Sequence, residues 1–169
     1  MPRMRRGVKR SRSPMPSTVI GLWLRAFLLR DAQTRRALTA KLNGGKRGWS
    51  HDEAGVVPAA SELAVRLFFG AHYDIRAVTE AVSFMRDADL AGGTTPHGQL
   101  EMEAVIRSVL GEADVDTSGI NPQVAFEIQG AITAYTVFKL NVPEPEVLRL
   151  ICQAEQIASD RGWKPPRAA

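Results

Sequence analysis

Apolar residues recur at separations of three and four positions along most of the chain, which is the pattern of helices that bury one face. Ile75, Val78, Val82 and Met85 are one such set. No segment of comparable strength alternates polar and apolar residues with period two, as a half-buried strand does. The sequence therefore predicts an all-α fold without a sheet.

Start and stop signals divide this pattern into six segments. Residues that cap free backbone amides precede the segments, and glycine or asparagine follows most of them. Pro58 is expected to kink or restart the second helix. The predicted helices cover about residues 17–43, 50–70, 74–92, 96–110, 122–141 and 143–161, and their start signals are Ser17, the capping box Ser50–Glu53, Asp74, Thr95-Pro96, Asn121-Pro122 and Pro143-Glu144.

These segments are expected to form one domain, a single helical bundle of five or six helices over residues 17–163. A chain of 169 residues is long enough to bury about two thirds of the surface that it exposes when unfolded. Residues 1–16 contain six basic residues, three prolines and no acid, so burial cannot offset their chain entropy. We predict a disordered basic arm at 1–16 and a flexible C-terminal end at 164–169.

Charge is divided sharply along the chain. Residues 1–47 hold 13 of the 22 basic residues and a single acid, Asp31, which gives a formal charge of +12, whereas residues 48–169 carry −8. A chain that started at the alternative Met15 would still carry +6 before Gly48. This asymmetry predicts a basic arm and first helix on an acidic body, and it suggests a polyanionic partner.

Our first hypothesis is a non-enzymatic binding or regulatory protein that contacts DNA or RNA through this arm and first helix. Flexible cations neutralise phosphates without a fixed fold, which gives salt-sensitive binding with little sequence preference. The candidate nucleic-acid-binding residues are Arg3, Arg5, Arg6, Lys9, Arg10, Arg12, Arg35, Arg36, Lys41, Lys46 and Arg47.

Two other readings of the charge remain open. A protein–protein module or homo-oligomer could pair one chain's basic helix with an acidic surface, because complementary charges steer association. The arm could also act as a solubilising tail. We expect no association with a membrane surface, since the apolar run 19–29 is too short to span a bilayer and too wide for an interfacial helix. The lone Cys152 indicates a reduced thiol in a cytoplasmic protein.

A helix-turn-helix fits the sequence poorly. Around Asn141 the spacing of Val137 and Val147 is approximately right, but Glu144 and Glu146 would lead the second helix toward the phosphates. We therefore expect no recognition helix there.

Catalytic and metal-binding patterns are also weak. His51, His72 and His97 fall near predicted helix starts or turns, and His97 with Glu101 would supply half a metal site at most. The run Gly44-Gly45-Lys46 lacks the spacing of a phosphate loop. We expect no catalytic residue, metal or cofactor, although an enzyme could still gather residues from distant helices in a cleft.

Overall fold

The computed structural model describes residues 14–43, 55–88 and 97–169. Within these ranges the chain forms helices and no strand, which confirms the all-α class. The count is higher than the five or six helices expected, because the segment 17–43 forms two. The seven described helices are α1 (Val19–Leu28), α2 (Ala32–Asn43), α4 (Val56–Phe69), α5 (Ile75–Asp87), α6 (Gln99–Val109), α7 (Pro122–Lys139) and α8 (Glu144–Asp160).

The first predicted helix is broken at Arg30, which has a φ of 60°. The amide of Arg30 donates to the Phe27 carbonyl, and the amide of Asp31 donates to the Ala26 carbonyl. These two bonds form a Schellman turn, which satisfies carbonyls that the end of a helix leaves unpaired. The chain then reverses, so that α1 and α2 pack against each other as a helical hairpin.

Aspartate or asparagine side chains cap the starts of three described helices. Asp31, Asp74 and Asn121 each accept a backbone N–H two or three residues further on, at 2.8–3.0 Å. The caps at Asp74 and Asn121 confirm the sequence-based prediction. Asp31 had no predicted structural role, and it is the cap that allows α2 to begin directly after the turn.

Several predicted helix boundaries lie outside the described residues. These are the capping box Ser50–Glu53, the end of the third predicted helix near 90–93 and the residues Thr95-Pro96. Helix α6 begins later than predicted, at Gln99, with Gly98 at the N-cap position. Pro58 lies in the first turn of α4, where a helix does not need its missing N–H. The helix is therefore continuous from Val56 to Phe69.

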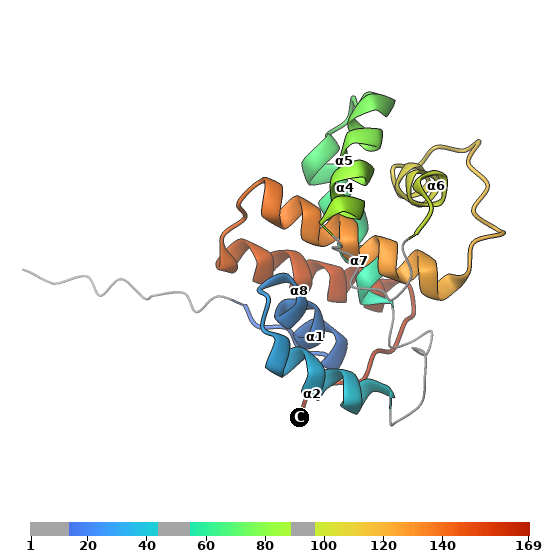
Figure 1. The fold of residues 1–169 in the computed structure, drawn as a ribbon. Helices are drawn as coiled ribbons and strands as arrows, with labels where there is room; N and C mark the ends of the chain where they lie inside the picture. The colour runs from blue at the N-terminus through green and yellow to red at the C-terminus, as the bar shows by residue number, and fades with distance from the viewer. Residues whose placement is uncertain (1–13, 44–54, 89–96) are drawn as a thin grey trace, which may run out of the picture.

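Helix α4 links the two halves of the structure, because it packs on both α7 and α8. In Figure 1, α5 and α6 lie on one side of α7 and α8, and the α1–α2 hairpin lies on the other. One apolar cluster joins α1, α2, the first half of α4 and α8, and it includes Ile20, Leu24, Val56 and Ile151. The second joins the rest of α4 to α5, α6 and α7, and it includes Val65, Val82, Ile106 and Ile132.

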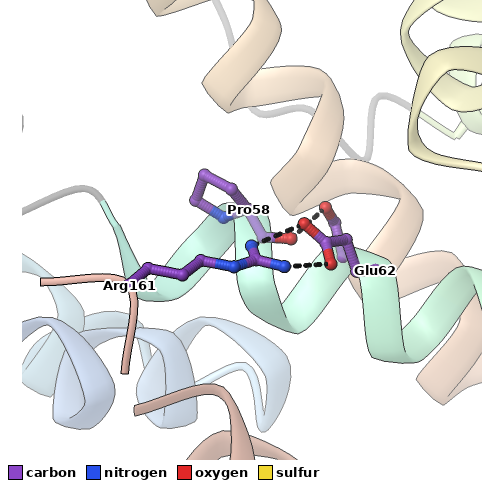
Figure 2. A network of polar contacts seen from close by, with 4 residues as sticks. Pro58, Glu62 and Arg161 are labelled. Carbon is purple, nitrogen blue, oxygen red and sulfur yellow. Dashed lines mark hydrogen bonds and ion pairs between the residues drawn. The ribbon is translucent and has the colours of Figure 1, made fainter. Parts of the chain in front are cut away.

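An ion pair fixes the end of α8 on α4. Arg161 donates from two guanidinium nitrogens to the two carboxylate oxygens of Glu62, at 2.7 and 2.8 Å. Figure 2 shows this fork beside Pro58, whose carbonyl accepts a hydrogen bond from the Ser61 hydroxyl. The hydrogen bonds from Arg161 lower the pKa of Glu62 below its ordinary value. Two parallel hydrogen bonds of this kind fix the relative orientation of the two side chains and add electrostatic attraction.

The two ends of the described chain pair with each other. The Val19 amide donates to the Pro166 carbonyl, and the Ala168 amide donates to the Ser17 carbonyl, both at 2.9 Å. We expected residues 164–169 to be a flexible end. Here their backbone forms a short antiparallel contact at the start of α1.

A buried carboxylate lies beneath this contact. Glu155 of α8 is 9% exposed, and it accepts hydrogen bonds from the amides and hydroxyls of both Ser17 and Thr18 at 2.6–3.1 Å. The hydroxyl of Thr18 also accepts from the Gly21 amide, so Thr18 caps α1 and not Ser17 as predicted. We call this arrangement the Glu155 clamp, and it ties the start of α1 to α8.

Gly21→Ala should destabilise the protein by about 2 kcal/mol, as overpacking does, although alanine ordinarily favours a helix by about 1 kcal/mol over glycine. A Cβ at Gly21 would lie 2.2 Å from Glu155 Oε1 and 2.9 Å from Thr18 Oγ1, so the carboxylate would have to give up its bonds. Urea unfolding measures the effect. In a Glu155→Ala background the same change should cost less, because only the 2.9 Å contact with Thr18 Oγ1 remains; an equal cost in both backgrounds would contradict the clamp.

Candidate functional site

Three of the predicted nucleic-acid-binding residues lie in the part of the chain that the structure describes. Arg35, Arg36 and Lys41 all belong to α2. The remaining candidates lie outside the described residues: Arg3, Arg5, Arg6, Lys9, Arg10, Arg12, Lys46 and Arg47.

The three cations of α2 do not share one face. Arg36 and Lys41 are exposed, and five positions of helix separate them by about 140° around the axis. Neither makes an ion pair with a described residue. Arg35 is partly buried and is turned toward α1, where its guanidinium lies 5.7 Å from the centre of the Phe27 ring. Helix α2 therefore presents scattered positive charge and no basic stripe.

A hollow of about 670 Å³ lies where the α1–α2 turn meets the C-terminal ends of α5 and α7. Its walls combine apolar side chains with Arg30 and Arg35, and no acidic residue belongs to its described lining. Phe27 lines it from α1, and Phe138 lines it from α7. We call this hollow the basic groove.

One side of the basic groove carries a stack of cations and rings. Arg30 lies 5.6 Å from the centre of the Phe138 ring, which stacks on Phe84 at 5.8 Å. Lys139 Nζ lies 4.2 Å from the Phe84 centroid and 5.9 Å from that of Tyr135. Phe138 is 52% exposed. We call this set the Arg30–Lys139 stack.

The opposite wall carries a second stack. The Phe27 ring beneath Arg35 lies parallel to the Trp23 ring, with centroids 5.4 Å apart and planes 9° apart. The Trp23 indole N–H donates to the Thr39 hydroxyl on α2 at 2.9 Å. These contacts hold the guanidinium of Arg35 against an aromatic face, where a cation is attracted by the ring quadrupole.

The described lining of the basic groove carries the positive charges of Arg30 and Arg35. Helices α1, α5 and α7 end there, and each helix end contributes about half a negative charge. Asp31 and Asp87 are chain neighbours of lining residues, and both are exposed. Arg30 also occupies the left-handed region, which costs a residue with a Cβ about 1 kcal/mol. A glycine would turn the chain more easily, so this position carries a cation at a conformational cost.

One of the basic residues before Gly48 forms an ion pair with another helix of the fold. Arg25 of α1 donates to Glu144, the first residue of α8, at 2.8 Å. The basic segment is therefore divided: Arg25 pairs with the acidic body, while Arg30, Arg36 and Lys41 lie exposed.

A second hollow, of about 650 Å³, lies beside the α4–α5 turn and contains polar groups that already satisfy one another. Arg107 donates to Glu112 Oε2 at 2.6 and 2.7 Å, and the Tyr73 hydroxyl donates to Glu112 Oε1. The hydrogen bonds from Arg107, and then from Tyr73, lower the pKa of Glu112. Because Arg107, Tyr73 and Glu112 satisfy one another, they form a clasp for the loop after α6; His72 also lines this hollow.

This clasp predicts a pH effect. A carboxyl whose pKa is lowered by folding stabilises the folded state above its unfolded pKa, near 4.5 for Glu112, and that stabilisation is lost as the pH falls through the lowered value. The NMR titration midpoint of Glu112 should therefore lie below 4.5 and rise in Arg107→Gln, with a smaller rise in Tyr73→Phe. A midpoint unchanged in Arg107→Gln would contradict the clasp.

His51 lies outside the described residues, and His72 lines the second hollow. His97 is buried, and its Nε2 lies 2.9 Å from Glu127 Oε2 on α7 instead of facing Glu101. Burial, and then Glu155, raises the pKa of the Cys152 thiol. Across the described ranges, no three His, Cys, Asp or Glu side chains are grouped so that they could hold a metal ion. No described helix combines the length and apolar character needed to cross a bilayer.

The basic groove is thus the described site that combines exposed charge with exposed aromatic surface. Sequence reasoning identified Arg35 but missed Lys139, Phe138 and the position of Arg30. Comparisons with protein-family models, with curated proteins and with solved structures found no match to this chain.

Proposed function

We propose that this is a non-enzymatic nucleic-acid-binding protein, in which the basic N-terminal arm and the α1–α2 hairpin contact DNA or RNA. One observation carries the proposal. Arg30 and Arg35 line a groove whose described lining contains no acid, and each of them lies on an aromatic ring. A nucleic-acid strand has phosphates that cations attract and bases that stack on aromatic side chains, so a site with both kinds of side chain can bind it.

The charge distribution supports the same proposal. Residues 1–47 carry +12, and α1 and α2 account for part of that charge on the surface beside the groove. Electrostatic binding of this kind releases counterions, so its affinity falls steeply as the salt concentration rises. The arm would add contacts without needing a fixed conformation.

Filter binding to nucleic acid at several salt concentrations tests the proposal. Deletion of residues 1–14 removes six cations, so it should lower the affinity and reduce the slope of log K against log salt by up to about 4 for a single strand. A variant with those six residues changed to serine keeps the length of the arm and should behave like the deletion. If the affinity is unchanged in both variants, the arm does not contact nucleic acid. If the full chain does not bind at low salt, the proposed function is wrong.

Self-association is the second candidate, because apolar surface lies beside the same cations. Phe138 is 52% exposed and Leu140 is 44% exposed, on a chain whose residues 48–169 carry −8. A basic, partly apolar face could pair with an acidic face of a second copy. Light scattering should then give a mass above that of the monomer at low salt and a lower mass at high salt. A monomer under both conditions would exclude this candidate.

A further inference from the structure

We infer that the basic groove binds unpaired nucleotides and not a duplex. The inference rests on the proposed function and specifies its ligand. It follows from three features of the described residues: an exposed aromatic ring, the size of the hollow, and the placement of the cations and acids around it.

The exposed ring is that of Phe138. About half of its surface is open to solvent, and the guanidinium of Arg30 lies over it at 5.6 Å. Bases that are free of a partner strand stack on phenylalanine rings and on arginine guanidinium planes. A base can stack on this pair, or displace the exposed Arg30 side chain, which then turns to a phosphate. Bases inside a duplex have no open face to offer.

The hollow has the size of a site for a small group. Its volume of about 670 Å³ lies within the range of about 300–1,000 Å³ in which pockets hold small ligands. One or two bases fit such a space, whereas a double helix does not. The cations of its lining, Arg30 and Arg35, are placed to meet the phosphates of a strand whose base enters the hollow.

Neither α2 nor the first turn of α8 offers a basic face for the grooves of a duplex. Arg36 and Lys41 lie on different sides of α2, so this helix cannot present both cations to one DNA groove. The first turn of α8 carries Glu144 and Glu146, whose charges repel phosphates. The cations of the basic groove line a hollow with an aromatic wall and do not lie along a helix face. This arrangement favours the binding of single strands.

Fluorescence anisotropy with two probes tests the inference: a labelled oligothymidylate of about 12 nucleotides and a labelled duplex of the same length. The full chain should bind the single strand at least about tenfold more tightly. Phe138→Leu, which keeps apolar volume but loses the ring, should weaken single-strand binding about tenfold, as loss of one stacked base does. Phe138→Tyr should retain the affinity, because it restores an aromatic face.

Leu140→Ala is the matched control, since Leu140 is a similarly exposed apolar residue beside Phe138 that belongs to neither stack. It should leave the affinity for the single strand within about twofold. Equal or tighter binding of the duplex, or equal losses in Phe138→Leu and Leu140→Ala, would overturn the inference and leave the proposed function standing. Failure to bind either probe at low salt would overturn both.

Discussion

Glu155→Ala should lower the free energy of unfolding by about 4 kcal/mol, a loss near the upper end for single substitutions. The carboxylate is the acceptor for the amides and hydroxyls of Ser17 and Thr18, and Thr18 is 3% exposed. Each buried donor left without an acceptor costs about 1–3 kcal/mol. In a domain of this size the melting temperature should fall by about 10 °C, as calorimetry would measure.

Two further variants separate the clamp from a general effect on α8. Gln153→Ala changes an exposed residue of the same helix and should alter stability by no more than about 0.5 kcal/mol. Glu155→Gln keeps the shape but replaces one acceptor oxygen with a donor, so its loss should be intermediate. Hydrogen exchange should speed up first at the amides of residues 17–19 and of Arg167 and Ala168 in Glu155→Ala. A uniform acceleration across α8 would contradict the clamp.

The triple variant Arg30→Gln, Arg35→Gln and Lys139→Gln should bind single-stranded nucleic acid about 100-fold more weakly at 0.1 M salt. Each cation that contacts a phosphate contributes about 0.7 to the slope of log K against log salt, so the slope should fall by about 2. Arg30 and Arg35 line the basic groove, and Lys139 lies over the Phe84 ring that stacks on Phe138 of its wall. Anisotropy titrations at four or more salt concentrations give both quantities.

The control removes the same charge from another surface. Arg66, Arg76 and Arg86 are exposed on α4 and α5 and border no part of the basic groove. Their triple change to glutamine alters the net charge equally and should reduce the affinity only a few fold, through the long-range field. Equal losses in the two triple variants would mean that net charge, and not the groove, governs binding.

The helices could be predicted largely from local signals. Asp74 and Asn121 cap α5 and α7 as their side chains and spacing indicated. Asn141 and Gly162 adopt positive φ after α7 and α8, where they were expected to end helices. A cap depends on a few neighbouring residues, and so it can be recognised without knowledge of the tertiary structure.

The break at Arg30 could not be predicted in the same way. Arginine favours helices and seldom adopts a positive φ, so the sequence from 17 to 43 was interpreted as one helix. The signal that was present is Asp31 followed by Thr34, a polar cap in an otherwise basic segment. Tertiary packing of α1 on α2 and α8 outweighed the local preference for a continuous helix.

The candidate site depended on contacts between distant segments. Charge counting identified Arg35 as a candidate, because the basic residues cluster in sequence. Lys139 lies more than 100 positions from Arg30 and joins it only through the stack of Phe138 on Phe84. The role of Glu155 could not be predicted for the same reason. Nothing near it in the sequence indicates that the start of α1 supplies its hydrogen-bond donors.

Photocrosslinking tests the central claim most directly, because it locates the bound strand on the protein. An oligothymidylate that carries a photoreactive thiothymidine is bound to the full chain at low salt and irradiated, and the crosslinked peptides are identified by mass spectrometry. We predict crosslinks within residues 26–36 and 134–142, which surround the basic groove, besides any in the arm. Crosslinks confined to α6 and the loop that follows it, with neither groove segment labelled, would contradict the account.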